Sequence, residues 1–344
     1  MHDILFVPRA FGYSRKVRVM DYLPYLDLAG VSYQVVHPPA RFIRHAYQWV
    51  PFIFRVLTWG RKSRVIFVQK DILWPTLWAY LQRCGCKIVY DFDDAIFAAP
   101  ESGKRAVYCF SLSRKSSEVQ VGEMIRRSDL TIVANDYLAQ FARKHGARVC
   151  VFPMSVKLSD YRPKQHGPRR PVIVGWHGSP FTVPHLALVK DALQQIARRY
   201  GEAVEFVFMT NGVVPRLDLP YRQIPLTQEN EIAALADFDV GIVPLPESPF
   251  SLGKCSFKLI QYLAAGQPTV SARLGFNAEV IRDGENGFLA GDSREWYDKL
   301  SRLIEDAGLR QRFGEEGRRT AAQKFDIAIN SQAWVKLIRE YLPS

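Results

Sequence analysis

Short apolar runs that resemble β-strands alternate with helix-like segments along the whole chain, and this alternation is the strongest constraint on the fold. Apolar, often β-branched runs that are separated by helices are typical of parallel sheets covered by helices. We therefore predict an α/β protein. The first six runs cover residues 3–8, 32–36, 63–69, 87–94, 130–135 and 148–153.

The pattern starts again after a basic passage rich in Pro and Gly, residues 158–171, which is the best candidate for a linker. A chain of 344 residues suits two domains of about 150 residues each. Five further strand-like runs follow, at 172–178, 204–210, 239–245, 268–272 and 287–291. The predicted divisions are an N-terminal domain 1–160, a linker 161–171, a C-terminal domain 172–325, and a C-terminal helix 326–344 that packs back on the first domain.

The composition is basic, since 46 Lys and Arg stand against 34 Asp and Glu, a net charge of +12. This balance favours an anionic partner, such as a nucleotide, a nucleic acid or an acidic membrane surface, but does not choose among them. Cys84 and Cys86 are the only close pair of the five cysteines, and their spacing is poor for zinc. We expect reduced thiols in a cytoplasmic protein without a signal peptide, since no apolar run reaches the roughly 18 residues of a membrane span.

The stretch 253–268, GKCSFKLIQYLAAGQP, predicts a helix with a basic face. Lys254, Lys258 and Gln261 are spaced by four and three residues, so a helix places them on one side. Gly253 lets the chain turn before the helix, and the first free amides of the helix point outward with the positive end of the dipole. Such a helix tip is suited to a phosphate or diphosphate, with Gln261 near a ribose. Ser256 is a further candidate donor contact. The alternative is a solvated amphipathic surface helix.

A second candidate phosphate site follows the run 172–178. Gly178, Ser179 and Thr182 stand between this strand and the next helix, where amides and hydroxyls can bond phosphate oxygens. The alternative is an ordinary strand-to-helix loop with a helix cap. His177 is either a satisfied loop histidine or a contact to the substrate.

The blocks FDVGIVPLP, GKCSFKLIQYLAAGQPTV and AEVIRDGENGFLAG resemble the donor-binding half of glycosyltransferase family 4 enzymes. VIVGWHGSPFTVPHL, IVYDFDDAIF and FGYSRKVRVMDYLPYLDLAG extend this resemblance along almost the whole chain. It implies a GT-B fold, with two Rossmann-like βα domains facing across a cleft, and a nucleotide-sugar donor. The family usually carries two glutamates eight positions apart, and here Gly253 and Gln261 occupy those places, so no carboxylate role is carried over.

The resemblance also assigns residues in the first half of the chain. It implies that Gly12, Ser14 and Arg15 lie against the donor phosphates or the acceptor, where Arg suits a phosphate. We also expect that Asp93 or Asp94, near a place where family members often carry a histidine, lines the cleft and orients sugar or acceptor hydroxyls, which makes these two the catalytic candidates. A metal at this D-x-D sequence is not implied, and the alternative is a structural capping cluster.

Residues 28–70 contain no Asp or Glu and combine basic with aromatic side chains. This composition is typical of an interfacial membrane segment. The alternative is a buried helix with a basic rim. The candidate membrane contacts are Arg41, Arg44, Trp49, Phe52, Arg55, Trp59, Arg61 and Lys62.

These observations together predict a glycosyltransferase, and the resemblance implies that it retains the anomeric configuration and needs no metal; we expect no cofactor. It would move a sugar from a nucleotide-diphosphate sugar to a saccharide or lipid-linked acceptor during surface polysaccharide or glycoconjugate synthesis. We expect it at the inner face of the membrane. The alternatives are a different GT-B chemistry, a catalytically inactive nucleotide-sugar-binding protein and a basic nucleic-acid-binding protein. The chain lacks a nucleic-acid-binding signature, so we expect no nucleic acid partner.

Overall fold

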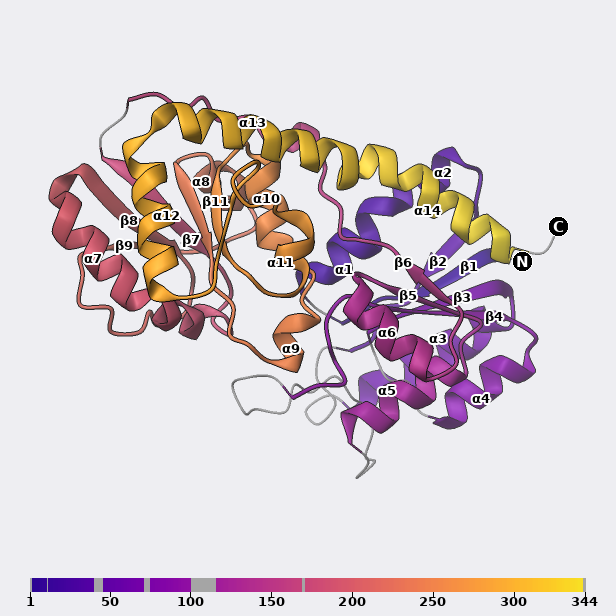
Figure 1. The fold of residues 1–344 in the computed structure, drawn as a ribbon. Coiled ribbons are helices and arrows are strands. Elements are labelled where there is room, and N and C mark those ends of the chain that lie inside the picture. The colour runs from indigo at the N-terminus through magenta and orange to yellow at the C-terminus, as the bar shows by residue number, and fades with distance from the viewer. Residues whose placement is uncertain are drawn as a thin grey trace. The chain divides into compact units, whose positions relative to one another are not determined.

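The computed structural model describes residues 2–10, 12–39, 46–70, 75–99, 116–168 and 171–342, which form two compact units (Figure 1). The N-terminal unit comprises Met1–Ser155, Leu252–Cys255 and Ile327–Ser344. The C-terminal unit comprises Val156–Ser251 and Ser256–Asp326. Each unit is built around one parallel sheet of six strands.

The sheet of the N-terminal unit has the strand order β2-β1-β3-β4-β5-β6, and all its pairings are parallel. All six strand-like runs predicted in this half are confirmed. The order changes direction between β1 and β3, and ligands of open α/β sheets bind at such a switch point, beyond the carboxyl ends of the strands. The strands are β1 (His2–Val7), β2 (Tyr33–Val35), β3 (Ser63–Gln69), β4 (Lys87–Phe92), β5 (Leu130–Val133) and β6 (Val149–Val151).

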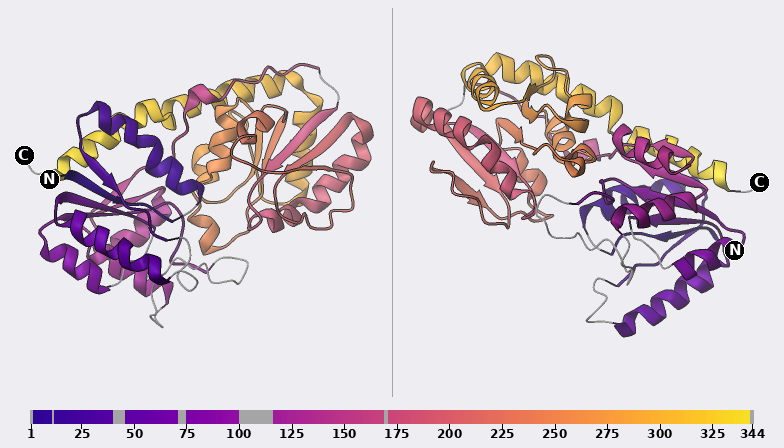
Figure 2. Two further views of the ribbon diagram at one scale, coloured as in Figure 1. Left: turned by 180° about the vertical axis from the view of Figure 1, so that it is seen from behind. Right: turned by 60° about the horizontal axis from the view of Figure 1, so that its bottom comes forward.

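The last helix of the chain, α14, completes the core of the N-terminal unit. Its Trp334 is 1% exposed and stacks on Tyr22 and Phe6, with ring centroids 5.1 and 6.0 Å apart. Figure 2 shows α14 lying along α2. The predicted helix 326–344 corresponds to α14. The helices of this unit are α1 (Tyr13–Arg18), α2 (Leu23–Leu28), α3 (Trp49–Gly60), α4 (Pro75–Arg83), α5 (Ser117–Arg126), α6 (Asp136–Lys144) and α14 (Ile327–Tyr341).

The sheet of the C-terminal unit has the order β12-β11-β10-β7-β8-β9, again with parallel pairings. Its switch point lies between β7 and β10. The five predicted strands are confirmed, whereas the edge strand β9 was missed because it is short and largely polar. The strands are β7 (Val172–His177), β8 (Val204–Met209), β9 (Arg222–Ile224), β10 (Val240–Val243), β11 (Thr269–Ala272) and β12 (Phe288–Ala290).

Helices cover the second sheet, and their buried faces join the strands in one core that includes Trp176, Phe208 and Phe313. The predicted helix 184–200 is present as a 3-10 helix, Val183–Val189, that continues into α7. The helices are α7 (Lys190–Tyr200), α8 (Glu231–Leu235), α9 (Pro249–Leu252), α10 (Phe257–Ala264), α11 (Gly275–Val280), α12 (Ser293–Glu305) and α13 (Ala307–Lys324).

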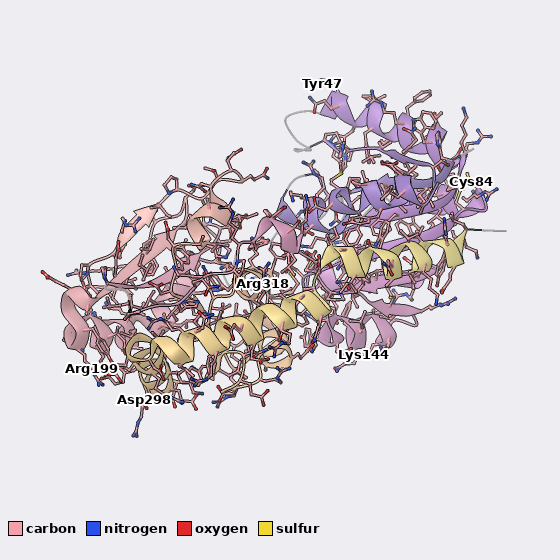
Figure 3. All side chains as sticks on the ribbon, turned by 90° about the horizontal axis from the view of Figure 1, so that it is seen from above. Tyr47, Cys84, Lys144, Arg199, Asp298 and Arg318 are labelled. Carbon is pink, nitrogen blue, oxygen red and sulfur yellow. The ribbon has the colours of Figure 1, made fainter. Side chains whose placement is uncertain are left out.

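The predicted linker 161–171 is counted with the C-terminal unit and is tied to it by hydrogen bonds and an ion pair. Lys164 Nζ lies 3.1 Å from Asp239 Oδ1. The Arg318 guanidinium on α13 donates to the carbonyl of Tyr161 at 2.8 Å (Figure 3). The described residues of this stretch therefore pack as part of a domain.

None of the helices in the described ranges has the length and apolar character needed to cross a membrane. The four cysteines within these ranges, Cys84, Cys86, Cys150 and Cys255, are free thiols, as predicted.

Candidate functional site

The switch point of the C-terminal unit brings together Gly178, Thr182 and Lys258. Gly178 directly follows β7, and a Cβ atom there would lie 2.6 Å from both Lys258 Nζ and Thr182 Oγ1. Real Cβ atoms do not approach other heavy atoms so closely, so this approach requires glycine. Three of the predicted donor-binding residues are thus neighbours in space although they are up to 80 positions apart.

Lys258 is held in place by a ring and a hydroxyl. Its Nζ lies 4.4 Å from the centroid of the Trp176 ring and donates to Thr182 Oγ1 at 3.2 Å. A cation over an indole face is attracted by the ring electrons, which fixes the ammonium without neutralising it. The side chain is half-buried, and Ser179 beside it is exposed. The arrangement can bind an anion.

His177 is the last residue of β7 and is 2% exposed. Its burial and the Lys258 charge hold the pKa of the imidazole well below its usual value, so the ring is neutral at pH 7. Its Nδ1 lies 3.6 Å from Glu231 Oε1, and its backbone N–H donates to the Tyr262 hydroxyl. The buried Nε2 has no hydrogen-bond partner among the described residues. A buried polar atom of this kind is suited to a ligand.

The stretch 253–268 is not one helix, so the predicted helical face is wrong for Lys254, whereas Lys258 and Gln261 both lie on α10. The helix α10 begins at Phe257, because Ser256 adopts a left-handed conformation with φ 47°. Gly253 and Lys254 precede it and are counted with the N-terminal unit. A Cβ at Gly253 would lie 2.5 Å from Ala95 Cβ, and Lys254 O accepts from Asn135 Nδ2 at 3.1 Å.

The α10 helix is nevertheless no solvated surface helix. Six of its eight residues are buried, and Gln261 among them is 1% exposed and donates to the Tyr161 hydroxyl at 3.2 Å. The predicted contact of Gln261 with a ribose stays a prediction. At the other end of the helix, Ser256 is 9% exposed, and its Oγ has no hydrogen-bond partner within the described ranges.

In the N-terminal unit, the loop after β1 and the start of α1 hold Gly12, Ser14 and Arg15, and Gln69 binds this segment. The Gln69 amide donates to Ser14 O and Oγ at 2.9 and 3.1 Å, and Arg9 N donates to Gln69 Oε1. Gly12 has φ 104°, and Arg15 donates to Ala10 O. Gly12, Ser14 and Arg15 therefore stand at the carboxyl edge of β1, next to β3. Sequence reasoning missed Gln69, because a single glutamine at a strand end carries no signal.

The acidic residues at the end of β4 have different environments. Asp91 is buried against the Arg18 guanidinium, whose Nε lies 3.1 Å from both carboxylate oxygens. The side chain of Asp93 is 3% exposed, and that of Asp94 is 25% exposed. Of the two predicted catalytic residues, Asp94 is thus the one that solvent and ligands can reach. Within the described ranges, no cluster of three or more His, Cys, Asp or Glu could hold a metal ion.

The predicted membrane contacts are split between the two sides of α3. Trp49 and Phe52 are each 4% exposed and belong to the interior, so their predicted outward role is wrong. The outward apolar residues are Tyr47, Val50 and Phe54, which are 70%, 70% and 68% exposed, and Figure 3 labels Tyr47 at the outer edge of its unit. Arg55, Arg61 and Lys62 are exposed, Trp59 is half-buried, and Arg41 and Arg44 lie outside the described residues.

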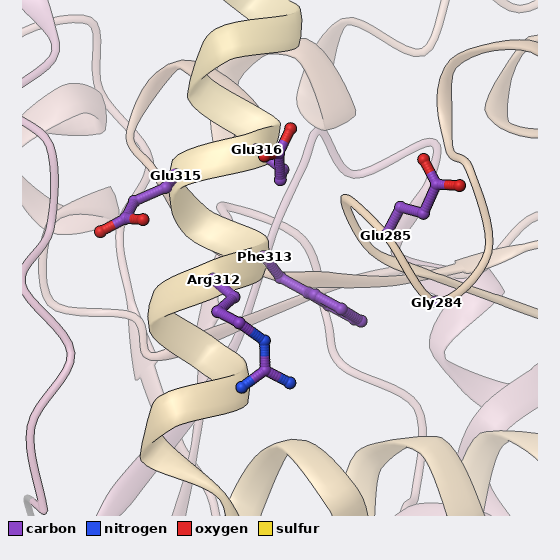
Figure 4. Close-up of a pocket in the computed structure, with 6 residues that line it drawn as sticks. All are labelled: Gly284, Glu285, Arg312, Phe313, Glu315 and Glu316. Atoms are coloured by element: carbon purple, nitrogen blue, oxygen red, sulfur yellow. The ribbon is translucent and has the colours of Figure 1, made fainter.

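A pocket of about 540 Å³ lies between α13 and the turn that precedes β12 (Figure 4). None of the predicted site residues lines it. Its lining consists of Gly284, Glu285, Arg312, Phe313, Glu315 and Glu316.

The chain has two Rossmann-like domains, each with a parallel six-stranded sheet, and the solved structures described below share its fold, so the predicted GT-B fold is confirmed. Residues 172–306 match the family model described as Glycosyl transferases group 1, which covers the basic site around Lys258. Family 4 membership in particular is not established by this match. The match and the relatives below support a glycosyltransferase.

The chain is similar to an MMP alpha-(1->4)-mannosyltransferase of Mycolicibacterium hassiacum. The two are 28% identical over 236 residues, which cover 64% of this chain and 54% of the relative. The matched part thus spans about half the length of that relative.

Solved structures with the same fold cover nearly the whole chain. A sucrose-phosphate synthase from Thermosynechococcus elongatus superposes with a TM-score of 0.76 at 14% identity, over 99% of both chains. Anabaena Alr3699/HepE in complex with UDP superposes with a TM-score of 0.71 at 14% identity, over 98% of this chain and 100% of that one. The same protein has also been solved with UDP-glucose.

Proposed function

We propose that this protein is a glycosyltransferase that moves a sugar from a nucleotide-diphosphate sugar to a saccharide or lipid-linked acceptor. The observation that carries the proposal is the Lys258 ammonium, held over Gly178 at the switch point of the domain that matches the glycosyltransferase model. The complexes of Alr3699/HepE with UDP and UDP-glucose support a donor of this kind.

In this proposal the diphosphate binds between the amides after β7 and the first turn of α10. Lys258 and the helix amides stabilise the negative charge that develops on the departing diphosphate. The neutral His177 Nε2 accepts a hydrogen bond from a donor hydroxyl, because Glu231 lies beside the other ring nitrogen. Catalysis is then mainly positioning and charge stabilisation.

The finer points of the proposal come from the resemblance to family 4. The transfer retains the anomeric configuration, needs no metal ion or cofactor, and serves surface polysaccharide or glycoconjugate synthesis. The acceptor binds at the carboxyl edge of the N-terminal sheet, near Asp94.

We also propose that α3 contacts an anionic membrane surface at the inner face. The support is one exposed strip in which Tyr47, Val50 and Phe54 follow one another at helical spacing, with Arg55, Arg61 and Lys62 nearby. Apolar side chains that insert at the interface and cations that attract acidic lipids are the two components of peripheral binding.

Ligand binding tests the donor site. The protein is screened by thermal shift and calorimetry against UDP, UDP-glucose and GDP-, ADP- and dTDP-sugars, and transfer is followed with a radiolabelled sugar donor. At least one nucleotide sugar should raise the melting temperature by mass action. Lys258→Met should remove that shift, whereas Lys190→Met, which removes a surface lysine paired with Asp218, should keep it. No shift with any nucleotide sugar, or an unchanged shift in Lys258→Met, contradicts the proposal.

Sedimentation with anionic phospholipid vesicles tests the membrane contact. Phe54→Glu should lower the bound fraction severalfold. Leu28→Glu changes an 85% exposed leucine of the same unit and should leave binding unchanged. Equal binding by both variants rules out α3 as the contact.

A further inference from the structure

Lys70 is a buried lysine that no part of the proposed site uses. It directly follows β3, which pairs with β1 at the switch point of the N-terminal unit. Its relative exposure is 1%, and its backbone is left-handed with φ 58°. Both properties cost free energy for a lysine, and strained, buried residues of this kind cluster at functional sites.

The Lys70 ammonium joins two carboxylates at the end of the neighbouring strand. Its Nζ lies 2.5 Å from Asp93 Oδ1 and 2.5 Å from Asp94 Oδ2. Its backbone N–H donates to Asp91 O at 2.7 Å, which continues the β3–β4 ladder into the cluster. The left-handed turn therefore lets one residue extend the sheet and direct its side chain toward both carboxylates.

The two carboxylates of this cluster differ in accessibility. The Asp93 side chain is 3% exposed and serves as the inner counter-ion, whereas Asp94 remains one quarter exposed. One oxygen of Asp94 is bound to the ammonium. A carboxylate has several further lone-pair positions, so the rest of Asp94 can accept hydrogen bonds from a ligand.

We propose that Lys70 is a positioning residue, which holds the Asp94 carboxylate at the switch point so that it accepts a hydrogen bond from an acceptor hydroxyl. This inference rests on the proposed function. It assigns to Asp94 the binding and orientation of the hydroxyl, and it makes Lys70 part of the acceptor site through Asp94.

The charges around Asp94 support a role in orientation over one in proton removal. Burial alone would raise the pKa of Asp94, but the ammonium groups of Lys70 and Lys254, and the Arg9 guanidinium, hold it below its usual value. Asp93, the other carboxylate of the cluster, shares the Lys70 ammonium with Asp94. A carboxylate with a lowered pKa is a weak general base but a good hydrogen-bond acceptor.

The pKa of Asp94 is measured first, because this needs no substrate. Carbon-13 NMR of aspartate-labelled protein follows the carboxyl titration, and Asp94→Asn identifies the signal. The Asp94 carboxyl should titrate below its ordinary value in the parent protein. In Lys70→Met it should titrate higher by about one pH unit or more, because a cation is lost. Lys70→Arg should restore most of the shift.

Kinetics then test the consequence for the acceptor. With UDP-glucose as donor and a panel of octyl glycosides as acceptors, Lys70→Met should raise the KM for the acceptor about tenfold or more. The KM for the donor should stay within about twofold, since the proposed diphosphate site at Lys258 lies on the other unit. The acid limb of the kcat/KM profile should move to higher pH.

Each outcome of these two experiments either supports or overturns the proposed role of Lys70. An Asp94 signal that titrates alike in the parent and Lys70→Met overturns the proposal, and so does an equal rise of both KM values. Should Lys70→Met fail to fold, Lys70→Arg and Asp94→Asn carry the test, since only Asp94→Asn should weaken the acceptor. Absence of transfer and of nucleotide binding counts against the proposed function, whereas the NMR titration still decides on Lys70.

Discussion

Gly178→Ala tests the geometry of the proposed donor site with a single methyl group. The new Cβ would stand 2.6 Å from Lys258 Nζ, 2.6 Å from Thr182 Oγ1 and 2.7 Å from a carbon of the Trp176 ring. Ordinary contacts are near 3.5 Å, so each neighbour has to retreat by roughly 1 Å. Lys258 can swing away, but the Trp176 ring is 0% exposed and packed in the core.

Two magnitudes follow from this crowding. Overpacking of a buried site lowers the unfolding free energy by about 1–3 kcal/mol. Alanine also restricts the unfolded chain more than glycine does, which raises the unfolding free energy by about 0.4–1 kcal/mol. We therefore expect a modest net loss of unfolding free energy. Displacement of the ammonium removes a charge-assisted hydrogen bond worth about 1.5–3 kcal/mol, which lowers nucleotide affinity about 10- to 150-fold.

The assay is calorimetric titration of UDP into the parent protein, Gly178→Ala and a matched control. Gly167→Ala serves as the control, because a Cβ at Gly167 has no atom within 4 Å. The control should bind UDP as the parent does. If Gly178→Ala binds UDP within about twofold of the parent while remaining folded, the proposed contact between Lys258 and the diphosphate is refuted.

Three further predictions concern the core, the buried ion pair and metal dependence. Trp334→Ala should lower the unfolding free energy by about 3–5 kcal/mol in urea titrations, because it empties the stack on Phe6 and Tyr22; a loss below about 1 kcal/mol would contradict the packing. Arg18→Met leaves the buried Asp91 carboxylate without its cation, so we expect a similar loss of about 3–5 kcal/mol in unfolding free energy, measured in the same way. This loss should be larger at higher pH, and an unchanged urea midpoint would show that the pair is not buried as described. Exhaustive treatment with a chelator should leave sugar transfer unchanged, and a rate that falls and returns with added Mg²⁺ would refute metal independence.

The strands and their alternation with helices could be predicted because their signals are local. Apolar runs such as 63–69 and 172–178 carry their own propensity, and both became strands near the predicted boundaries. The edge strand β9 could not be predicted in this way, because three largely polar residues form a strand only when β8 offers its backbone.

The face of α3 shows a different limit of sequence patterns. Trp49, Phe52 and Val56 are the buried side of the helix, while Val50 and Phe54 are exposed on another, as is Tyr47 just before it. Both sides are apolar, so periodicity alone does not say which one packs on the sheet. Only the position of the neighbouring strands decides that Trp49 and Phe52 are interior.

The start of α10 depends on a distant contact in the same way. The sequence 253–261 has no helix breaker after Gly253, and this suggested one continuous helix. The close approach of Gly253 to Ala95 and the left-handed Ser256 delay the helix until Phe257. Lys254 consequently lies outside α10, although its spacing of four from Lys258 is typical of one helical face.

The amino-acid sequence by itself determined the two parallel βα sheets and marked the glycine, histidine and lysine of the proposed donor site, since hydrophobic period and turn residues act within a few positions. The tertiary structure decided which charged groups meet. Lys70 looks from the sequence like one more basic surface residue, and it becomes a buried counter-ion because the β3–β4 register places Gln69 opposite Asp91. Strand pairing sets this register across more than twenty residues, and electrostatic energy depends on the resulting distances in space rather than on order along the chain.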